Sequence, residues 1–156
     1  MMNGDFIIED RTGKTFPDYT RPPNEVNSII EDKTGKFWFG TRGNTFVYDG
    51  KTFTVFTYNG KPFSNVRSII EDKKGNIWTT GSINPLAGPV WALSRYDHKS
   101  LYNKKPTVTE IMSGGRMDFL GILEANDGSI WFGSGGGVHR YDGKTITDFK
   151  SKEGQQ

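Results

Sequence analysis

The stretch Val66-Arg-Ser-Ile-Ile-Glu-Asp-Lys-Lys-Gly-Asn-Ile-Trp78 decides the fold, because the chain contains this pattern three times. Similar stretches run from Val26 to Gly40 and from Phe119 to Gly133, and each copy continues to a Tyr-Asp pair. Matches of this length do not arise three times by chance. The chain is therefore built from repeats of one structural unit.

Each repeat carries four short strand signals, which we call a, b, c and d. The Asp-x-x-Gly sequence after strand a and the Asp-Gly pair after strand c predict turns, because Asp bonds its own backbone and Gly accepts a positive φ. A period of 40 residues separates Val26 from Val66, and this is the length of one four-stranded β-propeller blade. In the first repeat the expected strands are 26–31, 37–41, 45–48 and 52–57.

A tryptophan stands at the same place in strand b of every repeat, at positions 38, 78 and 131. Propeller blades pack face to face, and a large flat ring at a fixed position fills the gap between neighbouring sheets. We therefore expect these tryptophans to have a structural role.

These residues resemble the two-component regulator propeller repeat, whose pattern is roughly I-x-E-D-x-x-G-x-I-W-F-G-T-x-x-G-V-x-R-Y-D. The segment from Ile69 to Trp78 is similar to its first half, and the segment from Ile130 to Gly143 to its second half. The resemblance covers residues 26–149. It implies blades of the kind found in periplasmic sensor regions of bacterial hybrid histidine kinases, which typically recognise carbohydrate fragments. A periplasmic or extracellular location is expected on the same grounds.

We expect a single all-β domain over residues 1–156, with β-propeller blades at 26–58, 66–112 and 119–149. These are three complete four-stranded repeats. Residues 5–20 add an N-terminal two-stranded partial blade, since Gly13-Lys-Thr-Phe16 matches Gly50-Lys-Thr-Phe53.

Three blades are too few for a closed ring, because propellers typically use four to eight. Open blade faces and unpaired edges at both ends favour association. The sequence therefore predicts a homodimer that completes or caps the propeller. The alternative is that these blades are a piece of a longer propeller.

The b–c and d–a loops of a propeller gather on one face, which is the usual binding surface. In the second repeat, eight extra residues lie between Trp78 and Tyr96, and we expect an irregular loop at 82–91. A tryptophan in this loop either stacks on a sugar ring or covers its own blade. Arg, Asn and Asp make directional hydrogen bonds to polar ligands. The candidate ligand-binding residues on this face are Arg42, Asn44, Arg67, Trp91, Arg116, Asp118 and His139.

The composition excludes several classes of protein. The net charge is +2 from 20 basic and 18 acidic residues, too balanced to predict binding to nucleic acid or a membrane surface. The chain has no cysteine, so disulfides and thiolate metal sites are impossible. No membrane span or signal peptide is recognisable in the chain as given.

The two histidines, His98 and His139, lie in different repeats, and no residues have metal-ligand spacing. No set of nucleophile, base and orienting group is recognisable. We therefore expect no cofactor and no catalysis. The sequence predicts a ligand-binding or sensor-type propeller module for a carbohydrate or other small polar ligand. A scaffolding propeller that binds proteins, and a propeller lyase or hydrolase, remain as alternatives.

Overall fold

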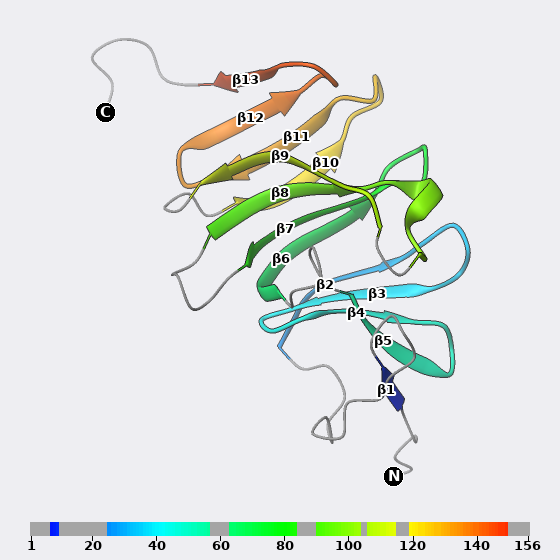
Figure 1. The fold of residues 1–156 in the computed structure, drawn as a ribbon. Coiled ribbons are helices and arrows are strands. Elements are labelled where there is room, and N and C mark those ends of the chain that lie inside the picture. The colour runs from blue at the N-terminus through cyan, green and yellow to red at the C-terminus, as the bar shows by residue number, and fades with distance from the viewer. Residues whose placement is uncertain are drawn as a thin grey trace.

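Three sheets, each with four antiparallel strands paired in sequence order, confirm the all-β propeller expectation (Figure 1). The computed structural model describes residues 7–9, 25–56, 63–83, 90–103, 106–114 and 119–149. Blade 1 consists of β2 (Val26–Glu31), β3 (Phe37–Thr41), β4 (Thr45–Tyr48) and β5 (Thr52–Phe56). Blade 2 consists of β6 (Phe63–Glu71), β7 (Ile77–Ile83), β8 (Val90–Tyr96) and β9 (Val108–Gly114). Blade 3 consists of β10 (Phe119–Glu124), β11 (Ile130–Ser134), β12 (Gly137–Tyr141) and β13 (Ile146–Phe149).

The N-terminal segment joins blade 1. Of the expected partial blade at 5–20, the structure describes only β1 (Ile7–Glu9), and the rest lies outside the described residues. β1 pairs in parallel with β5, which makes it a fifth strand of the blade 1 sheet. Blade 2 extends beyond its expected limits of 66–112, because β6 begins at Phe63 and β9 ends at Gly114.

The Asp-x-x-Gly turns form as their chemistry predicts. The Oδ1 atom of Asp32 accepts hydrogen bonds from the backbone N–H groups of Thr34 and Lys36, at 2.8 and 3.1 Å. Gly35 adopts a φ of +86°, which only glycine adopts without strain. The second carboxylate oxygen accepts a 2.9 Å bond from Trp38 Nε1. The aspartate thus holds the turn and the buried indole together.

The same anchor recurs in blade 2, where Trp78 Nε1 donates to Asp72 Oδ2 at 2.8 Å. In blade 3 Ala125 stands in place of the aspartate, and Trp131 Nε1 donates instead to Ser129 Oγ at 3.2 Å. The sequence predicts the turn role of these aspartates, and the structure adds their hydrogen bond to tryptophan.

Two hydrophobic cores lie between the blades. In the first, Trp38 and Phe56 of blade 1 pack with Ile69, Ile77 and Tyr96 of blade 2. The two ring contacts of Phe56, with Trp38 at 4.9 Å and Tyr96 at 4.6 Å, are edge-to-face, a favoured aromatic geometry. We call this contact junction 1–2.

Junction 2–3 repeats this arrangement one blade further along. Trp78 and Leu93 of blade 2 pack with Ile130, Phe132 and Tyr141 of blade 3. Trp38 and Trp78 therefore fill the gaps between sheets, as expected.

Hydrogen bonds between turns reinforce both junctions. The carboxylate of Glu71 accepts from the backbone N–H of Lys33 at 3.0 Å, and the Lys33 ammonium donates to the carbonyl of Lys73. One blade further, Glu124 accepts from the N–H of Lys73 at 2.9 Å. In blades 2 and 3, the glutamate at the end of the first strand therefore accepts from the turn of the preceding blade.

Candidate functional site

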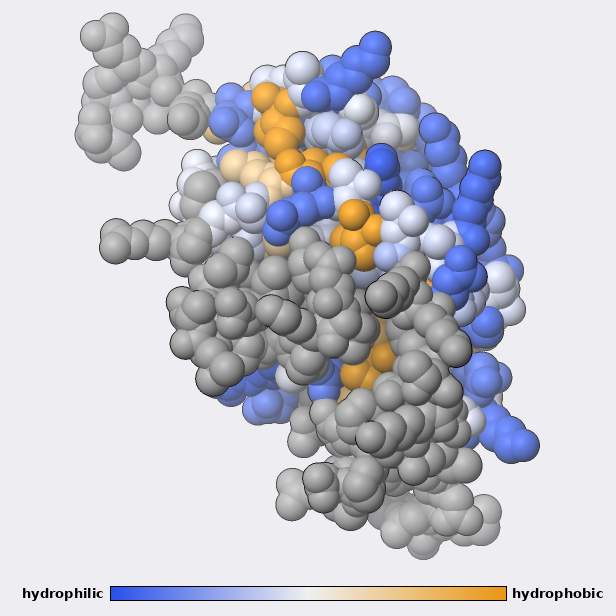
Figure 2. All heavy atoms as spheres, viewed as in Figure 1, coloured by the Kyte–Doolittle hydropathy of each residue, from blue (hydrophilic) through white to orange (hydrophobic). Residues whose placement is uncertain are grey.

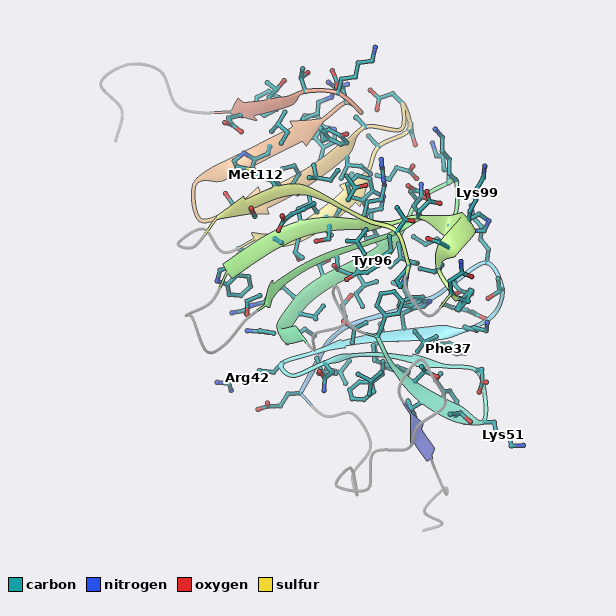
Figure 3. All side chains as sticks on the ribbon, viewed as in Figure 1. Phe37, Arg42, Lys51, Tyr96, Lys99 and Met112 are labelled. Carbon is teal, nitrogen blue, oxygen red and sulfur yellow. The ribbon has the colours of Figure 1, made fainter. Side chains whose placement is uncertain are left out.

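The β3–β4, β7–β8 and β11–β12 connections lie at one end of the blades, which we call the b–c end. Arg42 lies here, whereas Lys99 lies at the opposite, a–b end (Figure 3). Arg42 is exposed and forms a 3.6 Å ion pair with Glu25. The carbonyl of Asn44, a buried residue, accepts a 2.6 Å hydrogen bond from the Thr41 hydroxyl, which closes the same turn. Arg42 thus faces solvent, whereas Asn44 stabilises the turn.

The prediction of an irregular loop at 82–91 is wrong at both of its ends, and Trp91 is not in a loop. β7 continues through Ile83 and β8 starts at Val90, so Trp91 lies on a strand and pairs with Ser82. The expected loop shrinks to 84–89, which lies outside the described residues. The Trp91 ring is 7% exposed and belongs to the core of junction 2–3.

The structure brings Arg67 and Trp91 together. The guanidinium of Arg67 lies 5.6 Å from the centroid of the Trp91 ring, close enough for a cation–π contact. Because Trp91 is buried, its ring completes the blade core and is not an open platform for a sugar.

His139 is buried in a hydrogen-bonded series that the sequence reading missed. Its Nε2 lies 2.6 Å from Ser134 Oγ, and its Nδ1 lies 2.6 Å from Asp148 Oδ1. The Ser134 hydroxyl also accepts from the N–H of Gly136 at 3.0 Å. Phe132 stacks on the imidazole at 4.9 Å. The series joins β11, β12 and β13 at the b–c end.

Arg116 and Asp118 lie outside the described residues. Of the five predicted site residues that the structure describes, Arg67 and Trp91 of blade 2 are in contact. Arg42 and Asn44 share one turn of blade 1, and His139 belongs to blade 3. Among these described residues, the predicted b–c face thus brings only Arg67 and Trp91 into contact. A cleft at the opposite end of the blades has more converging side chains.

A cleft of about 340 Å³ opens between blades 2 and 3 at the a–b end. Trp78 of β7, Arg95 of β8 and Tyr141 of β12 form part of its walls. From the centroid of the Trp78 ring, the Arg95 guanidinium lies at 5.7 Å and the Tyr141 ring at 6.1 Å. The charged and polar side chains of the lining are Asp72, Lys73, Lys74, Arg95, Asn76, Glu124, Asp127 and Asp142. Aromatic walls with converging polar groups are typical of small-molecule sites.

Two carboxylates of this cleft are held in their charged form. The hydroxyl and the backbone N–H of Ser129, together with the guanidinium of Arg140, lower the pKa of Asp127 to about 2. The backbone N–H groups of Thr145 and Lys144 lower the pKa of Asp142. Both side chains therefore offer hydrogen-bond acceptors at neutral pH.

The corresponding groove of junction 1–2 is filled by the chain itself. After β8, Asp97 caps the short 3₁₀ helix η2 (His98–Ser100), and Leu101 enters the core. The Tyr102 hydroxyl donates a 2.6 Å hydrogen bond to Asp32 Oδ2, and the Lys36 ammonium lies 3.7 Å from the centroid of the Tyr102 ring. We call residues 97–103, the described part of the β8–β9 connection at this groove, the plug.

The hydrogen bond between Tyr102 and Asp32 shifts the pKa values of both groups. Burial and the hydrogen bond to Asp32 raise the pKa of Tyr102. Burial opposes ionisation of Asp32, but hydrogen bonds from Thr34, Tyr102, Trp38 and the Lys36 backbone lower its pKa to about 2. The Tyr102 hydroxyl of the plug therefore donates to a carboxylate that is charged at neutral pH.

Blade 3 has no such plug, because a tight turn at Gly143, with a φ of +105°, connects β12 to β13. The a–b turn glycines show the consequence. A Cβ at Gly75 would lie 2.7 Å from the plug residue His98, whereas a Cβ at Gly128 would meet nothing within 4 Å. The length difference between the c–d connections was visible in the sequence, but its effect on the groove was not.

Within the described residues, no group of three His, Asp or Glu side chains could hold a metal ion. None of the helices in that part of the chain has the length and apolar character needed to cross a membrane.

The sheets and their junctions define the chain as a run of β-propeller blades. Residues 20–43 and 60–82 match the family described as Two component regulator propeller. Each of the first two blades thus contains a segment that matches this family, and the resemblance found in the sequence is confirmed there. A search of curated proteins found no match.

Solved propellers share the fold. The chain is similar to the extracellular domains of the hybrid two-component systems BT4673 and BT3049 of B. thetaiotaomicron. Identities are 16% and 22% over 90% and 84% of this chain, with TM-scores of 0.63 and 0.60. The chain spans 18% and 17% of those domains. A protein assigned as a gluconolactonase aligns with 13% identity, a TM-score of 0.63, and coverage of 89% of this chain and 53% of that one.

Proposed function

We propose that the chain is a non-catalytic, ligand-binding module of the sensor type, which takes a hydroxyl-rich ring such as a sugar in the cleft between blades 2 and 3. The observation that carries this proposal is the plug. In the corresponding groove of junction 1–2, the chain places the six-membered, hydroxyl-bearing ring of Tyr102.

The chemistry of the two grooves matches. The Tyr102 ring meets a carboxylate, Asp32, and a cation, Lys36. The cleft between blades 2 and 3 offers Asp72 and Arg95 among its lining residues, beside aromatic rings. A pyranose presents a C–H face to an aromatic ring and hydroxyl donors to carboxylates, while a guanidinium donates to its oxygens. These features favour a sugar over an apolar ligand.

The repeats support a sensor role, because segments in two of them match a regulator propeller family and the similar structures include extracellular domains of two-component systems. A periplasmic or extracellular location is part of this proposal.

Isothermal titration calorimetry against a panel of oligosaccharides tests the ligand class. We expect at least one saccharide to bind, and Arg95→Ala to weaken its affinity by about tenfold or more, roughly 1.4 kcal/mol. The matched control is Arg42→Ala, which removes the same charge at the b–c end and should leave affinity unchanged. If no saccharide binds, or if both variants bind equally, the cleft is not a sugar site.

The Ser134–His139–Asp148 series tests the non-catalytic part of the proposal. Its groups are those of a hydrolase triad. However, the His139 side chain is 4% exposed while that of Asp148 is 40% exposed, and the Ser134 hydroxyl is engaged by the turn. We therefore expect a fluorophosphonate probe to leave the protein unlabelled. Labelling that is lost in Ser134→Ala would show that the chain is a hydrolase.

A further inference from the structure

Blade 3 ends the described sheets with an apolar face. Leu123, Val138 and Phe149 are 61%, 49% and 48% exposed, and the Trp131 ring stacks on Phe149 at 5.3 Å. Figure 2 shows hydrophobic side chains reaching the surface over this blade. In blades 1 and 2 the tryptophan-bearing face is covered by the next blade. No described residue covers it in blade 3.

Blade 1 presents the other half of the same junction. Ile29 and Phe37 occupy the places of Ile69 and Ile77 in blade 2, as the strand registers show. Ile69 and Ile77 are buried against Trp38, whereas Ile29 is 60% and Phe37 39% exposed. Among the described residues, blades 1 and 3 therefore expose the two surfaces that pack together at both junctions.

The hydrogen bonds between turns are incomplete at the same two ends. Glu31 in blade 1 occupies the place of Glu71 and Glu124, which each accept an N–H from the preceding turn. Asn126 in blade 3 occupies the place of Lys33 and Lys73, which donate that N–H. Within the described residues, Glu31 has no donor and the Asn126 N–H has no acceptor. One end thus offers an acceptor where the other offers a donor.

We propose that a second copy of the chain docks head to tail. Its blade 1 packs Ile29 and Phe37 on Trp131 and Leu123, and its Glu31 accepts from the backbone N–H of Asn126. This heterologous contact occurs twice if the two copies close on each other. The assembly then holds six of the described blades, within the range of closed propellers. The proposal rests on the repeated junctions and is independent of the ligand proposal.

Sedimentation velocity on two complementary variants tests the docking. The parent chain should sediment as a dimer. Ile29→Asp on the head and Leu123→Asp on the tail should each give a monomer with an unchanged circular dichroism spectrum. An equimolar mixture should recover dimers, because one copy keeps its tail and the other its head. Lys144→Asp, at an exposed turn, is the control and should stay dimeric. A monomeric parent, or a mixture that stays monomeric, overturns the proposal.

Disulfide trapping tests the register, since the chain has no native cysteine. We expect Glu31→Cys mixed with Asn126→Cys to form a covalent dimer under mild oxidation, and each variant alone to remain uncrosslinked. Cross-linking of Glu31→Cys to itself would show a symmetric contact and overturn the head-to-tail arrangement.

Discussion

Junctions 1–2 and 2–3 are built from the same parts, yet one is closed and the other is open. Both contain a buried tryptophan bonded to a turn aspartate and a glutamate that joins neighbouring turns. They differ in one connection. The plug fills the groove of junction 1–2, whereas a tight turn in blade 3 leaves a cleft of about 340 Å³ at junction 2–3. A single c–d connection thus decides whether a groove between blades is filled or left open.

The largest expected effect concerns the buried tryptophan that each junction has at the equivalent position. Trp38→Ala and Trp78→Ala should each lower the free energy of unfolding by about 3–5 kcal/mol, because both rings are buried and leave large cavities. Trp38→Ala should cost more, since its partner Asp32 also holds the plug. Urea titration followed by circular dichroism measures this. A smaller loss at Trp38 would contradict the plug's role in closing junction 1–2.

The next effect is the pH dependence of stability that Asp32 gives to junction 1–2. Because the pKa of Asp32 is lowered to about 2 in the folded state, its stabilisation is present above the unfolded value near pH 4 and is lost as pH falls toward 2. The size is about 2 kcal/mol. Urea titrations at pH 7 and pH 2.5 should show this loss in the parent chain and a reduced loss in Asp32→Asn. An unchanged pH dependence would show that Asp32 does not carry the charge that the plug needs.

Changes at Tyr102 open the closed junction. Tyr102→Phe keeps the ring but removes its hydrogen bond to a carboxylate, and should lower stability by about 1 kcal/mol. Tyr102→Ala also vacates the groove. If a saccharide binds at junction 2–3, calorimetry on Tyr102→Ala should show a second equivalent bound. Unchanged stoichiometry with intact binding would mean that the two grooves are not equivalent.

The smallest effect concerns the cation over the plug. Lys36→Gln should lower the free energy of unfolding by about 0.5 kcal/mol, because the cation–π contact with the Tyr102 ring is partly exposed. The effect should vanish in a Tyr102→Ala background, which a double-mutant cycle measures. A loss that persists in that background would assign Lys36 another role.

The blades were predictable because their signals are local. Asp32 and Gly35 form a turn from bonds within five residues, and the repeat shows where each strand begins. Trp91 was misplaced for the opposite reason. Nearby proline and glycine residues predicted a loop. Pairing between β7 and β8 instead extends β7 to Ile83 and lets β8 begin at Val90.

The candidate site was predicted only in part. Arg67 and Trp91 do lie together, but the cleft between blades 2 and 3 has walls from five strands of two repeats. The sequence did not show that Ser134 and Asp148 lie beside His139. Their proximity follows from the register of β11, β12 and β13, which the structure supplies.

The sequence by itself determined the repeat, the turns and the tryptophan that each blade places toward its neighbour, since these depend on residues close together in the chain. Tertiary structure alone decided which groove is filled. Tyr102 reaches Asp32 across 70 residues, and that contact exists only because blade 2 packs on blade 1. On blade 3, the equivalent face around Trp131 is not covered by any described residue.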